Sequence, residues 1–114
     1  MTLTTNRVEH ANRSALNLSG GARARCRIAR QFEEAGRYEA ARNALGDLWQ
    51  RIGERPNTEG LERGAAAEVL LRAGALAGWL GSVQQMEGAQ EFAKDLISES
   101  AGIFDTLGEA ERVA

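Results

Sequence analysis

The feature that most limits how this chain can fold is a pair of amphipathic helix patterns separated by one glycine, over residues 28–41. The first pattern ends at Gly36 and the second begins at Tyr38. Because glycine tolerates the positive φ of a helix C-terminus, two antiparallel helices joined by a tight turn are predicted here. Ala29 and Ala41 occupy the positions where the two helices would touch. Such hairpins build stacked α-helical scaffolds, so the pattern favours an interaction protein over an enzyme.

Composition predicts that the whole chain is α-helical. A single proline, Pro56, leaves long stretches of the 114 residues free to be helical. The chain contains twenty alanines, the best helix formers, whereas aromatic residues make up only 5%. Its length is sufficient for one domain with its own hydrophobic core.

Apolar residues repeated at steps of three and four predict four main helices. These helices cover about 22–35, 38–52, 59–81 and 84–107. Residues 1–21 form a polar segment, either a short helix or disordered, which Ser19-Gly20-Gly21 separates from the helical domain at 22–114. Gly108 is expected to end the fourth helix, and residues 109–114 to begin a fifth one that continues in a longer protein.

Two helices carry more detailed expectations. The helix over 22–35 should bury the face made by Ala24, Ile28, Phe32 and Ala35. The helix over 59–81, capped by Asn57 or Thr58, has an apolar stretch at 65–83 long enough to raise the question of a membrane span. Glu68 and Arg72 lie inside that stretch, four residues apart, where they can pair. A buried helix of a cytoplasmic protein, with no membrane contact, is therefore expected.

The first two helices resemble a tetratricopeptide repeat. That family places small and bulky residues at fixed positions of a helical hairpin, and the matching residues here are Ile28, Ala29, Phe32, Gly36, Tyr38 and Ala41. The last two helices look like a second, longer repeat, with Leu76, Ala77, Leu80, Met86 and Ala89 at the corresponding positions. The resemblance implies a short right-handed α-solenoid, with repeats at 22–55 and 57–108, like segments of longer bacterial repeat proteins.

Candidate catalytic residues are few. His10 is the only histidine and Cys26 the only cysteine, so no intrachain disulfide can form. Cys26 is expected to be a small apolar residue of its helix. No set of His, Cys, Asp and Glu has metal-ligand spacing, and no glycine-rich loop suits a phosphate. We therefore expect no catalytic activity, no metal and no cofactor.

The resemblance also implies a binding groove lined by the first and third helices. Carrying over the groove positions gives Arg23, Cys26, Arg30 and Glu33, with Arg27 adjacent. The matching positions of the third helix are Leu71, Gly74, Gly78 and Gly81. The arginines could grip carboxylates of a peptide, or form a solvated face beside acidic neighbours. The glycines could admit a helix or peptide backbone, with the adjacent Trp79 as a contact residue. Alternatively they could allow tight packing within the domain, with Trp79 as a core residue.

The sequence thus favours a non-catalytic protein–protein interaction module that binds a peptide or partner helix. An alternative is a helical bundle that associates with itself, for example as a homodimer, because the last helix has a wide apolar face. Charge is uneven, with ten arginines and six carboxylates in residues 1–55 but four cations and ten carboxylates in 56–114, which could favour head-to-tail association. Nucleic-acid binding is not expected, since the chain is acidic overall and no aromatic residues alternate with the arginines.

Overall fold

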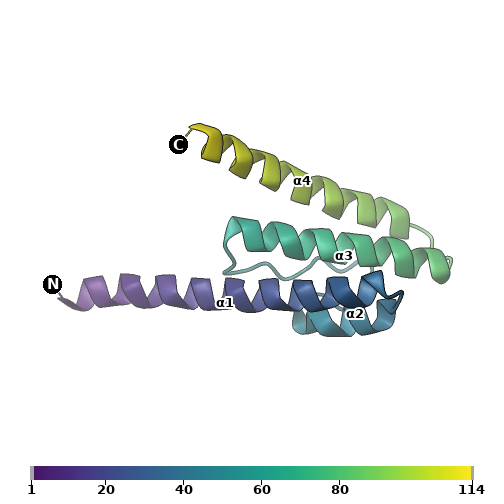
Figure 1. Cartoon of the computed structure of the whole chain (residues 1–114), viewed down its shortest axis with the longest axis horizontal. Helices are drawn as coiled ribbons and strands as arrows, with labels where there is room; N and C mark the ends of the chain where they lie inside the picture. Colours follow the sequence, from purple (N-terminus) through teal and green to yellow (C-terminus); the bar gives the residue numbers. More distant parts are fainter. Residues whose placement is uncertain (1, 114) are drawn as a thin grey trace.

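The chain is an all-α bundle in the computed structural model, which describes the backbone of residues 2–113 and the side chains of residues 17–108. The helices are α1 (Thr2–Glu34), α2 (Tyr38–Leu45), α3 (Arg63–Val83) and α4 (Ala89–Val113), and a single 3₁₀ turn, η1 (Gly46–Leu48), follows α2. Helices α1 and α2 form one antiparallel hairpin, and α3 and α4 form another. Helix α3 packs on both α1 and α2, and it separates them from α4 (Figure 1). The prediction of an all-α fold with four main helices is confirmed.

The glycine turn between the first two helices is also confirmed. Gly36 has a φ of 75°, and the Arg37 N–H donates to the carbonyl of Phe32 at 2.8 Å, as in a Schellman-type helix end. Ala29 and Ala41 are fully buried, so the two helices approach closely where their side chains are smallest.

The expected break at Ser19-Gly20-Gly21 is wrong, because α1 runs through these residues without interruption. A glycine in a helix interior costs about 1 kcal/mol relative to alanine, which tertiary contacts can offset. One such contact comes from Ser19, which is fully buried and whose Oγ accepts the backbone N–H of Glu62 at 2.9 Å. This bond ties the middle of α1 to the start of α3. His10 lies within α1, but the His10 side chain is outside the described residues.

The second and third predicted helices are each shorter than expected. Helix α2 ends at Leu45, since Gly46 has a φ of 58° and turns the chain into η1, so residues 46–52 do not continue the helix. Helix α3 begins at Arg63 and takes no cap from Asn57 or Thr58. Asn57 Oδ1 instead accepts the N–H of Glu59 at 3.2 Å and stabilises a turn in the connection.

The turn between α3 and α4 lies later than predicted, and α4 has no stop at Gly108. Gln85 and Gly88 both have positive φ, so the segment expected to start the fourth helix is a turn, and α4 begins at Ala89. The helix continues to Val113, so residues 109–113 extend α4 and the expected fifth helix is wrong. A single glycine raises the cost of a helix without ending it, unless the backbone takes positive φ there.

The buried face of α1 differs from the predicted one. Ala22, Cys26 and Ala29 are buried, whereas Ala35 is exposed and Ile28 is 47% exposed. Small side chains face α2 and α3, so the backbones come close together and the larger side chains lie outside the contact. Phe32 is half-buried, with the Arg37 guanidinium 5.2 Å from its ring centre.

Helix α3 supplies the centre of the core. The apolar stretch predicted at 65–83 contributes seven large or small apolar side chains that are all buried: Ala65, Val69, Leu70, Ala73, Leu76, Ala77 and Leu80. Of the other predicted packing residues, Tyr38 is half-buried and Ala89 buried, but Met86 is 44% exposed. By length and composition alone α3 could cross a membrane, but half of its most apolar window is buried in the bundle, as in many core helices.

Candidate interaction surface

An open groove of about 840 Å³ lies between α3 and α4 and is called here the α3/α4 groove. It is lined by Gly74, Ala75, Gly78, Trp79 and Ser82 of α3 and by Gln90, Ala93, Lys94, Ile97 and Ser98 of α4. Gly78 forms part of the floor, and Gln90 Nε2 donates to its carbonyl at 3.0 Å. Trp79 is 51% exposed and Ile97 is 39% exposed, so two large apolar side chains flank the groove.

A second hollow of about 250 Å³, called here the arginine pocket, lies where all three long helices meet. Its lining residues are Cys26, Arg27 and Arg30 of α1, Glu68, Leu71 and Arg72 of α3, and Phe104 of α4. Phe104 is 39% exposed, so this pocket also has an apolar edge.

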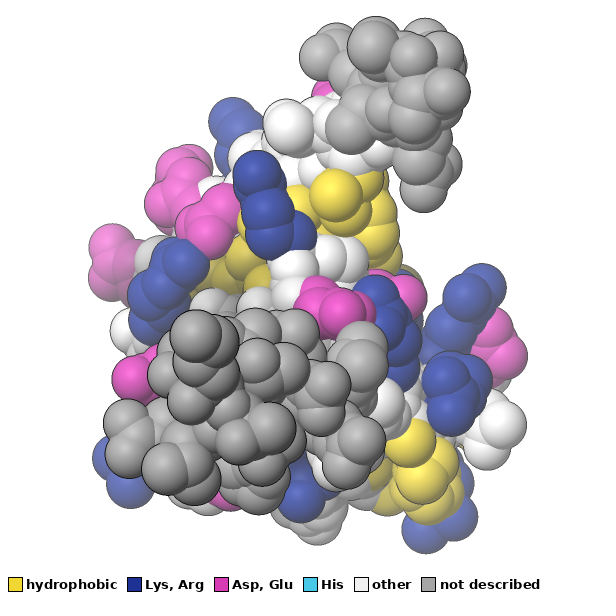
Figure 2. All heavy atoms as spheres, turned by 90° about the vertical axis from the view of Figure 1, so that its left-hand side faces the viewer, with side chains coloured by type: hydrophobic (Ala, Val, Ile, Leu, Met, Phe, Trp, Pro, Cys, Tyr) yellow, Lys and Arg dark blue, Asp and Glu magenta, His cyan; other side chains and the backbone are white. Residues whose placement is uncertain are grey.

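Both hollows lie on the same side of α3. Most of their α3 lining residues have another one three or four positions away, which places them on one helix face: Glu68, Leu71, Arg72, Ala75, Gly78, Trp79 and Ser82, with Gly74 at the edge toward α4. On α4 the spacing of Gln90, Lys94, Ile97 and Phe104 follows the same rule. Viewed from the end of the bundle, hydrophobic side chains reach the surface in the upper half, where α4 lies, among charged side chains of both signs (Figure 2).

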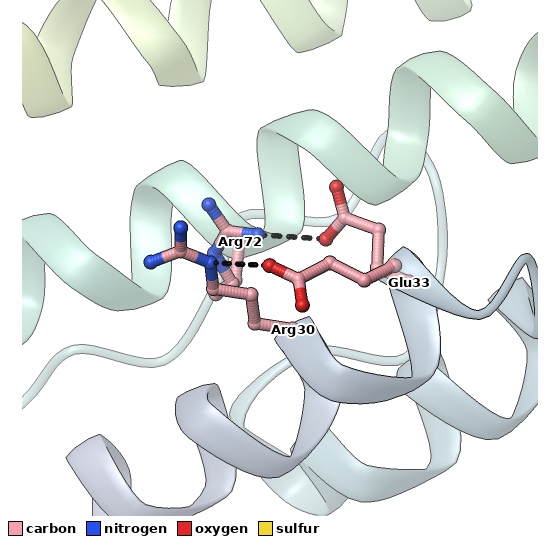
Figure 3. Close-up of polar contacts among 4 residues, drawn as sticks. Arg30, Glu33 and Arg72 are labelled. Atoms are coloured by element: carbon pink, nitrogen blue, oxygen red, sulfur yellow. Dashed lines mark hydrogen bonds and ion pairs between the residues drawn. The ribbon is translucent and has the colours of Figure 1, made fainter.

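The predicted arginines lie along this side, and most of them are engaged in ion pairs. Arg23 pairs with Glu62 at 3.3 Å, and Arg30 pairs with Glu34 at 3.1 Å. Glu33 is largely buried and pairs with Arg72 of α3 at 2.7 Å, so Arg72 bridges two helices rather than binding Glu68 (Figure 3). This pair joins α1 directly to α3 at the edge of the arginine pocket, which is the hollow that these two helices share.

The predicted glycines face α4 rather than α1. A Cβ added at Gly74 would lie 2.9 Å from Ile97 Cγ1 and 3.1 Å from the Ala93 carbonyl, and a Cβ at Gly81 would overlap that of Ala89. Gly74 and Gly81 therefore allow tight packing within the bundle, which was one of the two readings of the sequence. Gly78 alone has room, with nearest neighbours at 3.7 Å. The arginines and glycines do not oppose each other across one groove; they follow one another along α3.

Cys26 is buried at the inner end of the arginine pocket, as the sequence predicted for a small apolar residue. Burial raises the pKa of its thiol from 9.0 to about 11, and the Glu68 carboxylate acts in the same direction. Arg72 and Arg27 act in the opposite direction but do not compensate. The thiol is therefore kept neutral and poorly nucleophilic. Among residues 17–108, no group of three His, Cys, Asp or Glu could hold a metal ion.

Cys26 provides a test of this environment. In the native protein near neutral pH, the thiol should react with a disulfide reagent about a hundredfold more slowly than in the urea-unfolded chain, because fewer thiols are ionised and access is blocked. The folded pKa exceeds the unfolded one, so this group's stabilisation is complete below about pH 9 and is lost as the pH rises toward 11. The pH dependence of unfolding in Cys26→Ala should lack this loss; identical profiles for both proteins would contradict the buried thiol.

Sequence reasoning missed the α4 side of the groove. Ile97 and Phe104 belong to the wide apolar face of the last helix, and nothing in the sequence indicated a role for Lys94 or Gln90. The available signal was the width of that stripe, because one neighbouring helix covers only part of a wide apolar face. Trp79 lies at the surface, with its ring stacked on Tyr38 at 5.3 Å between centres, so the interpretation as a core residue is wrong.

Comparison with known proteins leaves the tetratricopeptide resemblance as a prediction. No protein-family model, no curated protein and no solved structure matches this chain.

Proposed function

We propose that the protein is a non-catalytic protein–protein interaction module, and that the side of α3 between α1 and α4 receives a helix or peptide of its partner. The observation that carries the proposal is the α3/α4 groove, an open hollow of about 840 Å³ flanked by exposed Trp79 and Ile97. Large exposed apolar side chains around a hollow are typical of surfaces that another protein covers.

The rest of this side supports the same assignment. Tyr38 stacks on one face of Trp79, which restricts the motion of the indole and lowers the entropy cost of a contact there. Arg27 of the arginine pocket and Lys94 of the groove add polar groups at the edges, as in an interface with an apolar centre and a charged rim.

The proposal can be tested by photo-crosslinking in the cells that produce the protein. A photoreactive residue placed at Ser82, which is exposed in the groove, should capture a partner protein. The same residue placed at exposed Glu54, in the connection before α3, serves as the control and should not capture it. Equal capture from both positions, or none from Ser82, would contradict the proposal. An adduct between two copies of the chain would favour the alternative, self-association.

A further inference from the structure

We infer that the occupant of this surface is an acidic amphipathic α-helix of about four turns. This inference rests on the proposed function and specifies its partner. It is carried by three properties of the described residues: the length of the hollowed side of α3, the spacing of its exposed apolar side chains, and the sign of the charge around it.

The length of the surface fits a helix. From Glu68 to Ser82 the lining residues cover about four turns of α3, or about 21 Å. The α3/α4 groove and the arginine pocket follow each other along this line, with α4 beside both and α1 beside the arginine pocket. A third helix laid along two packed helices makes contacts of the same kind as those inside the bundle.

The apolar contacts are spaced for a helix as well. Ile97 and Phe104 are seven residues apart on α4, so they project on one face about 10 Å apart. Apolar side chains at positions i, i+3 or i+4, and i+7 of a partner helix recur over the same distance. Trp79 on the α3 side completes an apolar strip with a hollow between its members.

The charge of the lining selects an acidic partner. The ionisable groups that line the two hollows are four cations, Arg27, Arg30, Arg72 and Lys94, and one carboxylate, Glu68, apart from the neutral Cys26 thiol. Glu33 and Glu34 pair with two of these cations. Arg27 on α1 and Lys94 on α4 have no carboxylate within 4 Å among the described side chains, although the chain carries a net charge of −2.

These two cations lie on different helices, Arg27 on α1 in the arginine pocket and Lys94 on α4 in the α3/α4 groove. A partner helix whose apolar stripe enters the groove would place its two flanks beside α1 and α4. Carboxylates on both flanks would therefore meet Arg27 on one side and Lys94 on the other. Such edge contacts add modest affinity and determine which helices are accepted.

The test uses three synthetic peptides of equal length. The first is a helix with a leucine and alanine stripe flanked by glutamates, the second has lysines in place of the glutamates, and the third is the acidic sequence interrupted by proline. Titration calorimetry with the full chain should show the acidic helix binding about tenfold or more tightly than the other two. Equal affinity for acidic and basic helices, or the absence of binding by the acidic helix, would overturn the inference.

Charge-reversal variants locate the binding. The double variant Arg27→Glu/Lys94→Glu should lower the affinity for the acidic peptide by about tenfold. Arg37→Glu/Arg51→Glu makes the same change in net charge at exposed positions that line neither hollow, and should leave the affinity within about twofold. Equal losses in both variants would show a non-specific charge effect and would overturn the site. If the acidic peptide does not bind but the photoreactive residue at position 82 still captures a partner protein, the proposed function stands and this inference is wrong.

Discussion

Replacing Trp49 with alanine is expected to lower the free energy of unfolding by about 3–5 kcal/mol, the largest loss for any single side chain of this bundle. Among the described side chains, Trp49 is the largest that is fully buried, with 1% of its surface exposed. It directly follows η1, where the chain becomes extended and leaves the first hairpin. Its removal would leave a cavity in the core cluster that also contains Leu45, Leu70 and Leu76.

The indole also orders the connection between the two hairpins. Trp49 Nε1 donates to the carbonyl of Glu54 at 3.0 Å, and the N–H of Asn57 donates to the carbonyl of Leu48 at 2.8 Å. Both bonds hold residues 49–57 against the helices. Removing the indole would therefore remove apolar contacts in the core and also release residues 49–57 from the helices.

Urea denaturation followed by circular dichroism measures the effect. A domain of this size has a total stability of about 5–15 kcal/mol, so the loss expected for Trp49→Ala is a large part of the total, and the milder variant Trp49→Phe provides a second measurement. Phenylalanine retains most of the apolar contact but cannot donate to Glu54, so a loss of about 1–2 kcal/mol is expected. A loss in Trp49→Ala no greater than in Trp49→Phe would contradict the role of the buried ring.

The sequence was sufficient to predict the helices and the first hairpin, because their signals are local. Apolar spacing of three and four determines a helix and its buried stripe, and Gly36 followed by Tyr38 determines a turn. The apolar stretch of α3 supplies the core because this central helix packs on α1, α2 and α4, so its apolar side chains meet neighbours in several directions.

The errors occurred where tertiary contacts decide between local alternatives. Gly20 and Gly21 continue a helix while Gly46 ends one, and the three glycines differ only in the backbone angles that the surrounding structure imposes. On α1, hydrophobicity favoured burial of Ile28, but closely packed backbones bury Ala22 and Cys26 instead. Size complementarity between helices cannot be read from one helix alone.

The candidate surface was predicted in its residue types but not in its geometry. Arg27 and Arg30 of α1 line the arginine pocket, and Gly78 of α3 lines the α3/α4 groove. The hollow itself lies between α3 and α4. Its width depends on how closely these helices pack at Gly74 and Gly81. That distance is a property of two helices together, so neither sequence pattern specifies it.

Gly81→Ala is expected to destabilise the protein by about 2–3 kcal/mol, although alanine is the better helix former. The added Cβ would overlap the Cβ of Ala89 and would also lie 3.6 Å from the Ala89 Cα, so the backbone of α4 must move. The backbone there is restrained, because the Gly81 carbonyl accepts the N–H of Met86 at 2.8 Å within the turn. The strain cannot be relieved by rotation of a flexible side chain.

Gly78→Ala is the matched control, three residues earlier on the same helix. Its Cβ would lie 3.7 Å from both the Ala93 Cβ and Gln90 Oε1, which is ordinary contact, so a gain of up to about 1 kcal/mol is expected. Urea denaturation of both variants gives the comparison, and titration with the acidic peptide separates packing from binding. Gly78→Ala should weaken binding of the acidic peptide while leaving the fold intact, because the added methyl group fills part of the groove floor. Equal stability of the two variants would show that α3 and α4 are not packed as closely as Gly81 and Ala89 require.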